Sequence, residues 1–439
     1  MRGKTDGLGL RALQGHKITA GGNAPGESGA PSRDPAGVAL LGARGRKTDM
    51  AAPGFDPSRV GPCGGRVFRE RCPRLSYRSP AGIKDGPRYS SPSNGVNAMK
   101  YSYMVKSAAK HVWSGLKLPY MVMFETTLMC NMFCEYCIFG EEGKFNDLKT
   151  RAIRDRIFKR IDEFCEMGIF ALSFSGGEPL LNPNTCDYIA CAADKGMWTS
   201  MPTNGLLIKK YADGVARLDM LEVSIDSLNV QRFAKRRGVD GLPKILENLD
   251  YVLTKRRPFT TQINAAVNIE NLHDLPELAE FAKQRHLVLH PEAVHNVMRS
   301  GELLPDVELH GKDLDTVEMF LRELRRAYPR NVRFYTHYYQ FYRQGGFGPQ
   351  FPCRHPSKLI SMKPDGSIHL PCAFATLHQS QAPLREIFAS DVARKIISQE
   401  ATLWDFCKGC KIGCPYEVSA LTNSPMLAVE SALNFLRIM

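Results

Sequence analysis

The chain has 439 residues, of which 43% are hydrophobic and 23% are charged, and its formal net charge at pH 7 is +13. This length can bury a large core and leaves room for two domains, while no apolar run approaches the ~18 residues of a membrane-spanning helix. Residues 1–98 carry about +9 of the charge, so the remainder is only mildly basic. That remainder has no recognisable nucleic-acid-binding module, and we expect no nucleic-acid partner.

Residues 1–98 hold about half of the 37 glycines, many prolines and almost no apolar periodicity. Such a composition cannot bury enough surface to offset chain entropy, so we predict a disordered extension. It lacks the apolar segment of a secretory signal, and its acidic residues argue against an arginine-rich targeting peptide. We expect this extension to be dispensable, with Met99 as the working start, its two cysteines (Cys63 and Cys72) to be incidental, and the protein to be cytoplasmic.

Residues 99–119 are predicted to form an amphipathic helix. An apolar stripe recurs there at helical spacing, formed by Tyr101, Met104, Ala108, Val112 and Leu116. Most such stripes pack on their own domain. A tryptophan and several lysines beside the stripe also suit an interfacial helix, which would make weak contact with a membrane surface. That alternative matters only for a lipid substrate.

An apolar run at residues 120–124 leads into a Cys-x3-Cys-x2-Cys loop formed by Cys130, Cys134 and Cys137. Three thiolates in one loop can hold three irons of a cubane, and the next cysteine is as distant as Cys165. One iron then stays open to an exogenous ligand, whereas electron-transfer clusters are normally closed by four thiolates. A zinc site would use Cys-x2-Cys pairs or a nearby histidine, and no histidine lies between residues 112 and 272.

From residue 150 onward, helix-like and strand-like stretches alternate. Helices are predicted at residues 150–167, 182–195, 209–217, 242–255 and 275–285. Strands are predicted at residues 170–174, 197–202, 221–225, 260–268 and 287–290. Repeated strand–helix units imply an α/β fold with a parallel sheet and helices outside. Six such units suit an incomplete barrel, whose ligands collect at the carboxyl ends of the strands.

Glycines and polar side chains follow these strands. The strand at residues 170–174 runs into a turn formed by Gly176, Gly177, Glu178 and Pro179. Two glycines let the backbone approach a ligand closely, and Glu178 offers a carboxylate to an ammonium group. An ordinary strand-to-helix turn is the alternative. Thr203 and Asn204 follow the next strand, and they either face the same rim or form a plain turn.

These motifs resemble the radical S-adenosylmethionine (radical SAM) enzymes over about residues 120–290. In their signature loop, Cys-x3-Cys-x-aromatic-Cys, Tyr136 occupies the aromatic position. The Gly-Gly-Glu-Pro turn matches the one that receives the methionine amino group, and residues 223–227 match the ribose-binding strand, with Ser224 and Asp226 as its polar positions. The resemblance implies a partial (β/α)6 barrel that binds SAM and a [4Fe–4S] cluster held by the three cysteines.

The resemblance also implies the chemistry. A reductant such as flavodoxin or ferredoxin reduces the cluster, SAM is cleaved to methionine and a 5′-deoxyadenosyl radical, and this radical removes a hydrogen atom from an unactivated carbon. The protein holds the target carbon close and keeps water out.

Beyond residue 330 a second group of cysteines follows, comprising Cys353, Cys372, Cys407, Cys410 and Cys414. Residues 359–370 predict a hairpin, because Pro364-Asp365-Gly366 supplies a turn, and this hairpin brings the first two cysteines together. An amphipathic helix at residues 384–398 returns the chain to the other three.

The C-terminal region looks like the twitch or SPASM extension of radical SAM enzymes, which carries auxiliary [4Fe–4S] clusters, although a full SPASM domain uses more cysteines. We predict a barrel domain at residues 120–330 and an auxiliary-cluster domain at residues 331–439. The predicted ligands of one cluster are Cys353, Cys372, Cys407 and Cys410. Cys414 is an alternative to either of the last two or a free thiol, and a zinc ribbon is the alternative to a cluster.

An auxiliary cluster favours a net oxidation or a cross-link over a reversible rearrangement. We therefore expect a radical SAM oxidoreductase that acts on a peptide or a small polar metabolite. A radical SAM enzyme acting on a membrane lipid is one alternative, motivated by the helix at residues 101–117. A non-catalytic iron–sulfur binding or assembly protein is another, although Glu178, Ser224 and Asp226 argue against a decayed site.

Overall fold

The computed structural model describes residues 119–137, 151–255, 260–294, 309–398 and 407–423, together with parts of 102–110. Its nine strands form one sheet in the order β6-β5-β4-β3-β2-β1-β7-β8-β9. The six parallel strands of the predicted barrel are β1 (Met121–Thr127), β2 (Ala171–Gly176), β3 (Trp198–Thr203), β4 (Met220–Ser224), β5 (Thr260–Val267) and β6 (Val288–Ala293).

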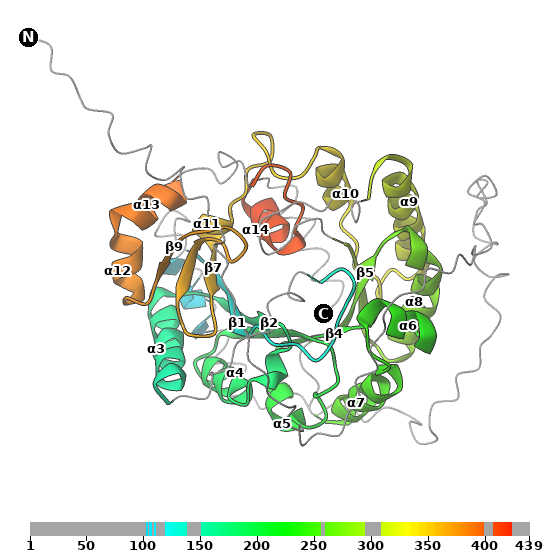
Figure 1. Cartoon of the computed structure of the whole chain (residues 1–439), viewed down its shortest axis with the longest axis horizontal. Helices are drawn as coiled ribbons and strands as arrows, with labels where there is room; N and C mark the ends of the chain where they lie inside the picture. Colours follow the sequence, from blue (N-terminus) through cyan, green and yellow to red (C-terminus); the bar gives the residue numbers. More distant parts are fainter. Residues whose placement is uncertain are drawn as a thin grey trace, which may run out of the picture. The chain divides into compact units, whose positions relative to one another are not determined.

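Helices cover the outer face of this curved sheet, and the ring of strands is not closed (Figure 1). They are α3 (Arg151–Met167), α4 (Thr185–Asp194), α5 (Ala212–Val215), α6 (Val230–Arg237), α7 (Leu242–Thr254) and α8 (Leu275–Gln284). Short 3₁₀ turns, η2 (Pro179–Leu181) and η3 (Ile269–Asp274), follow β2 and β5. The α/β partial barrel predicted from the sequence is confirmed.

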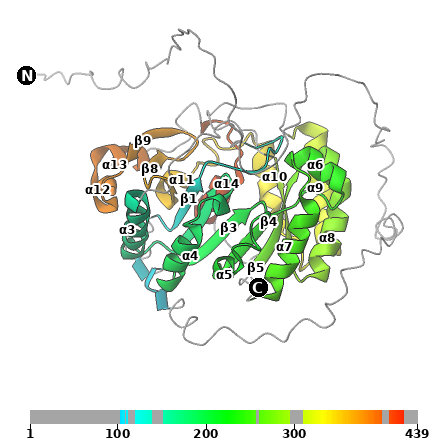
Figure 2. The same cartoon turned by 60° about the horizontal axis from the view of Figure 1, so that its bottom comes forward.

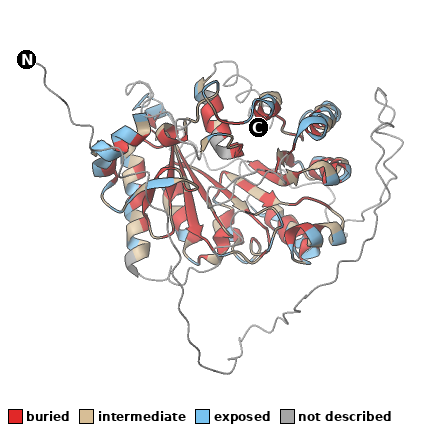
Figure 3. Ribbon diagram, turned by 45° about the horizontal axis from the view of Figure 1, so that its top comes forward, coloured by how far each residue is buried: buried red, intermediate tan, exposed pale blue. Residues whose placement is uncertain are grey.

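Alternation along the strands decides which side chains form the core. In β4, Leu221 and Val223 are completely buried, whereas Glu222 and Ser224 keep accessible surface. Because successive side chains of a strand point to opposite faces, the apolar pair packs against the outer helices and the polar pair faces the inside of the barrel. Buried residues accordingly follow the strands and the inward faces of the helices (Figure 3).

Two predicted helices differ from the structure. The helix expected at residues 209–217 shrinks to α5, which contains Gly214. A Cβ at that glycine would lie 2.4 Å from the Cys186 sulfur, so close packing on α4 requires a residue that weakens the helix. The helix expected at residues 384–398 is divided into α12 (Leu384–Ala389) and α13 (Asp391–Ser398), because Ser390 is extended.

The C-terminal region continues the barrel sheet. The predicted hairpin is present as β7 (Leu359–Met362) and β8 (Ile368–Pro371), followed by β9 (Thr376–Ser380). Strand β7 pairs in parallel with β1, and α12 and α13 lie beside α3 and β8 (Figure 2). The expected domain limits at residues 330 and 331 stay a prediction, since one sheet extends across both regions.

The remaining helices are α9 (Gly311–Ala327), α10 (Thr336–Arg343), α11 (His355–Lys358) and α14 (Gly413–Asn423). Helix α14 lies in the gap between the two ends of the ring (Figure 1). On one side its Glu417 carboxylate is 3.2 Å from the Arg333 guanidinium, which follows a segment bridged to β6 at Leu289. On the other side Ser419 Oγ accepts from Arg354 N, just before α11 (2.8 Å).

The described part of residues 102–110 is helical and docks on the end of α3. The Tyr103 hydroxyl donates to Ile169 O, Ser107 Oγ to Gly168 O, and Lys110 Nζ to a carbonyl in the same turn. The five residues of the predicted apolar stripe lie outside the described residues, as do residues 1–98 with Cys63 and Cys72, so the lipid-surface alternative stays untested. Among the described helices, none combines the length and apolar character required to cross a bilayer.

Candidate iron–sulfur and SAM site

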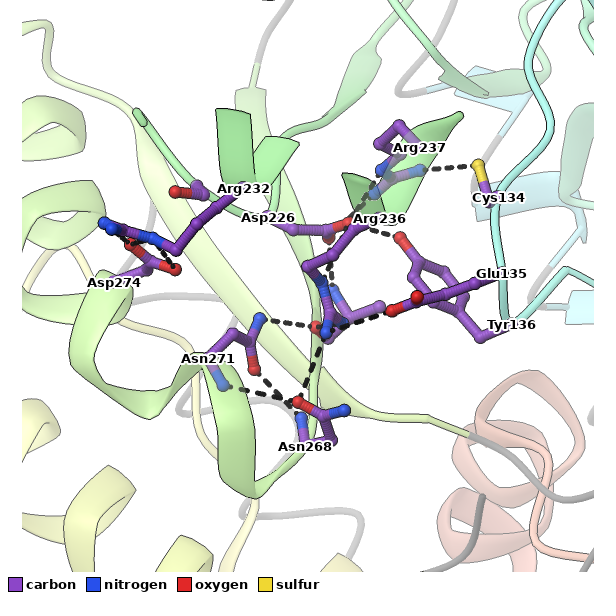
Figure 4. Close-up of polar contacts among 12 residues, drawn as sticks. Cys134, Glu135, Tyr136, Asp226, Arg232, Arg236, Arg237, Asn268, Asn271 and Asp274 are labelled. Carbon is purple, nitrogen blue, oxygen red and sulfur yellow. Dashed lines mark hydrogen bonds and ion pairs between the residues drawn. The ribbon is translucent and has the colours of Figure 1, made fainter. Parts of the chain in front are cut away.

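The three-cysteine loop, residues 130–137, is called the cluster loop here, and it lies against the C-terminal end of α6 (Figure 4). Phe133 N donates to Arg237 O and Glu135 N to Arg236 O, each at 3.1 Å. These carbonyls belong to the last turn of α6, where intrahelical donors are lacking. The loop therefore caps the helix, and the helix fixes the path of the loop.

Asp226, completely buried just beyond β4, holds the same loop from beneath (Figure 4). Its Oδ1 accepts from Arg237 Nη2 (2.8 Å) and Ala266 N (2.9 Å), while Oδ2 accepts from the Tyr136 hydroxyl and lies 2.7 Å from Arg237 Nε. Both carboxylate oxygens thus have protein partners that tie β4, β5 and the cluster loop together. The ribose contact expected of Asp226 stays a prediction.

The α6 arginines also approach the sulfur site. Arg237 Nη1 donates to Cys134 Sγ at 3.8 Å, and the guanidinium carbons of Arg236 and Arg237 lie 5.2 and 5.5 Å from the centre of the Tyr136 ring. Burial raises the pKa of the Cys134 thiol to about 11, and Arg237 opposes this rise because a cation favours the thiolate.

The glycine turn packs on the chain that leads into the cluster loop. Gly177 N donates to Thr127 O (2.9 Å) and Glu178 N to Met129 O (2.8 Å). A Cβ on Gly176 would lie 2.1 Å from Thr127 O, and one on Gly177 would lie 2.2 Å from Met129 O. The glycines were expected to let a ligand approach. In the structure they let two backbone segments meet, and this contact fixes where the cluster loop begins.

Glu178 joins the ends of β2 and β3. Its Oε1 accepts from Thr203 Oγ1 (2.8 Å) and Leu180 N (3.2 Å), and its Oε2 accepts from Asn204 N (2.8 Å). Burial raises the pKa of this completely buried carboxyl to about 6, although the three hydrogen bonds oppose the shift. The predicted rim residues Glu178, Thr203 and Asn204 are therefore brought together. The predicted ammonium contact of Glu178 stays a prediction.

Asn204 connects this network to the cluster loop. Its Nδ2 donates to Asn131 Oδ1 (2.7 Å) and lies 3.9 Å from Cys130 Sγ. Ser224, at the end of β4, keeps accessible surface beside its register partner Asn264. It remains the predicted ribose contact. Two independent networks, one through Asn204 and one through Arg237, thus end on two different cysteines of the loop.

The three thiols of the cluster loop fit a metal cluster. Each keeps some accessible surface. Burial, and to a smaller extent the charge of Cys137, raises the pKa of both Cys130 and Cys134, which places the three sulfurs in one electrostatic neighbourhood. Soft thiolates gathered in this way are the donor set that iron–sulfur clusters use.

The four predicted auxiliary ligands, from three separate segments, also meet. Burial raises the pKa of Cys353 far above its ordinary value, and the charges of Cys410, Cys372 and Cys407 raise it further. The side chain of Cys414 lies outside the described residues. Within the described ranges no three Cys, His, Asp or Glu side chains are placed to hold a single metal ion, and both the auxiliary cluster and the zinc ribbon stay predictions.

Arg236 and Arg237 are site residues that were not predicted. The signal available was a basic pair directly before Gly238, which adopts a left-handed φ of 70° and ends α6. Basic residues in a last helical turn are ordinary, because they favour the helix dipole. Nothing in the local pattern shows that these two side chains turn toward Tyr136 and Cys134.

Comparison with known proteins gives a consistent result. Residues 124–282 match the sequence model of the family described as Radical SAM superfamily. The PqqA peptide cyclase of Xanthomonas oryzae is 25% identical over 340 residues, which cover 70% of this chain and 85% of that protein. The GTP 3′,8-cyclase of Helicobacter pylori is 30% identical over 172 residues, which cover 38% of this chain and 53% of that protein. The chain therefore matches only about half the length of this cyclase.

A solved structure of SuiB from Streptococcus suis bound to S-adenosylmethionine shares the fold. Its TM-score is 0.52 at 17% sequence identity, and the match covers 76% of this chain and 81% of SuiB.

Proposed function

Since residues 124–282 of this chain match the radical SAM superfamily, we propose that Cys130, Cys134 and Cys137 hold a [4Fe–4S] cluster at which S-adenosylmethionine is reductively cleaved. The family's cofactors are this cluster and SAM; when bound and reduced, the cluster would give one electron to SAM, which would yield methionine and a 5′-deoxyadenosyl radical able to remove hydrogen from a substrate. The observation that carries the proposal is that three accessible thiols share one loop, which Arg237 contacts at Cys134 and Asn204 contacts at Cys130.

The protein's own residues have three tasks in this proposal. Arg237 holds Cys134 by its N–H···S contact and, through Asp226, fixes Tyr136. Asn204 holds the other end of the loop beside Cys130. Ser224 and Thr203 are assigned to SAM, because they end neighbouring strands at the rim where βα folds bind ligands.

We assign a peptide as the substrate class. The support is that the match to PqqA peptide cyclase covers 70% of this chain and 85% of that relative, which is more than the radical SAM domain alone. The four clustered thiols of the C-terminal region favour an auxiliary cluster, which in turn favours a net oxidation or cross-link. A flavodoxin or ferredoxin is the assigned reductant.

The proposal is tested by anaerobic reconstitution of the full chain with iron and sulfide, reduction with dithionite, and quantification of 5′-deoxyadenosine. The wild type is expected to form this product from SAM, and Cys134→Ala is expected to form none. Cys186→Ala, which removes a thiol on α4 outside both cysteine groups, is the matched control. A wild-type protein that binds iron but forms no 5′-deoxyadenosine would eliminate the proposal.

A further inference from the structure

A group of polar side chains faces the inside of the barrel on three neighbouring strands. They occupy the alternating inner positions of β4, β5 and β6, and the Arg333–Glu417 pair lies beside them. We call this set the inner polar cluster: Glu222, Gln262, Asn264, His290, Glu292, Arg333 and Glu417. Glu222, Asn264, His290 and Glu292 keep part of their surface accessible although they point inward.

Two of the three carboxylates are already compensated. Glu222 Oε2 accepts from Gln262 Nε2 and from Asn264 Nδ2, each at 2.9 Å. Glu417 pairs with Arg333 at 3.2 Å. Burial lowers the pKa of His290 well below its ordinary value, and the nearby Arg333 lowers it further, so this imidazole is neutral and supplies no cation.

Glu292 is different from the other two. Within the described residues its carboxylate makes no hydrogen bond and no ion pair. It lies at the start of α14, since a Cβ on Gly413 would be only 1.6 Å from Glu292 Oε1. Nearby, the hydroxyl of Tyr339 has no hydrogen-bond partner although this residue is 1% exposed, and burial followed by the charges of Tyr342 and Glu292 raises its pKa.

The position of Glu292 relates it to the proposed SAM site. Across the sheet, Ser224 is in register with Asn264, and Asn264 with His290. Glu292 is two residues further along β6, on the same inner face and toward the carboxyl ends of the strands. A group bound to Glu292 would therefore lie at the rim, separated by β5 from β4, the strand that carries the proposed ribose contact.

An interior polar group without a partner is costly, and a carboxylate gains most from a charged donor. The inner polar cluster holds three carboxyl groups and one guanidinium. Burial, followed by the charges of Glu417 and Glu222, raises the pKa of Glu292 to about 8, so its ionised form lacks a compensating charge that a bound cation would supply. We propose, on the basis of the proposed function, that the substrate presents a protonated primary amine, such as a lysine side chain of a peptide, and that Glu292 binds it.

The test uses the oxidised, SAM-loaded full chain, so that no turnover occurs. The probes are three capped amino acids with N-acetyl and C-methylamide groups: lysine, its uncharged analogue norleucine, and glutamate. Saturation-transfer NMR titrations measure the dissociation constant of each probe. The lysine probe is expected to bind about tenfold more tightly than the norleucine probe, as for a charge-assisted hydrogen bond, and the glutamate probe most weakly.

Glu292→Gln is expected to remove the preference for lysine over norleucine, and Glu292→Asp to retain part of it. Glu280→Gln is the control, because it removes one carboxylate from the exposed surface of α8, where Glu280 pairs with Lys283. Equal binding of lysine and norleucine, no measurable binding of lysine, or an unchanged preference in Glu292→Gln would each overturn the inference. Formation of 5′-deoxyadenosine by the wild-type preparation, measured without any of the three probes, tests the proposed function separately.

Discussion

The two cysteine groups of this protein are built in different ways. The cluster loop carries its three thiols within eight residues, and charged or amide side chains from α6 and the β3 turn hold it. The second group collects four thiols from three segments that meet only because β7 continues the barrel sheet and α14 crosses the open side. The first site is thus local in sequence and fixed by polar contacts, whereas the second depends on the tertiary fold.

The largest expected effect is on SAM cleavage, and it should distinguish the two cysteine groups. Cys134→Ala should abolish 5′-deoxyadenosine formation, because one thiolate of three is lost. Cys372→Ala should retain SAM cleavage while lowering the iron content by about half, since each [4Fe–4S] cluster contributes four irons. Iron and product assays on reconstituted protein measure both. Loss of SAM cleavage in Cys372→Ala would show that the two sites are not independent.

The next effect concerns the contacts by which Arg237 and Asp226 hold the cluster loop. Arg237→Met removes the closer of the two arginines that pair with buried Asp226, at 2.7 Å, and leaves only Arg236 at 3.8 Å. Breaking a buried pair costs about 3–5 kcal/mol. The unfolding temperature and the cluster occupancy should both fall. Lys235→Met is the control, because Lys235 is exposed on the same helix. If Arg237→Met unfolds at the same temperature as Lys235→Met, the contacts of Arg237 do not stabilise the fold.

Most of the fold, and part of the site, could be predicted from the sequence. The positions of the six barrel strands along the chain rest on short-range patterns, so the prediction and the structure agree there. The role of Asp226 could not be predicted from its neighbours in the sequence, because the groups that surround it come from the cluster loop, α6 and β5. The pairing of β7 with β1 and the position of Glu417 in α14 depend in the same way on contacts between distant segments.

A smaller effect is expected at the glycine turn. Gly177→Ala places a methyl group 2.2 Å from Met129 O, so the backbone entering the cluster loop must shift. Overpacking of this kind costs about 1–3 kcal/mol, and we expect lower cluster occupancy with little change in the second cysteine group. Gly348→Ala, at a position with no atom within 4 Å, is the matched control. Denaturant titration and iron content measure the difference.

A further effect concerns pH. Burial, followed by the charges of Glu417 and Glu222, raises the pKa of Glu292 to about 8, while Arg333 opposes the shift. Because the folded state holds this proton more tightly than the unfolded state, the contribution of Glu292 to the free energy of unfolding decreases as pH rises from about 4.5 to about 8. Urea titrations at several pH values should show a smaller decrease in Glu292→Gln. An identical pH dependence in both proteins would contradict the assignment.

The central claim is that the cluster loop holds a cluster with one iron open to SAM. Electron paramagnetic resonance of the reduced Cys372→Ala variant tests it most directly, since this variant isolates the first site. The account predicts a [4Fe–4S] signal whose g-values change when SAM is added. A signal that SAM leaves unchanged would contradict it.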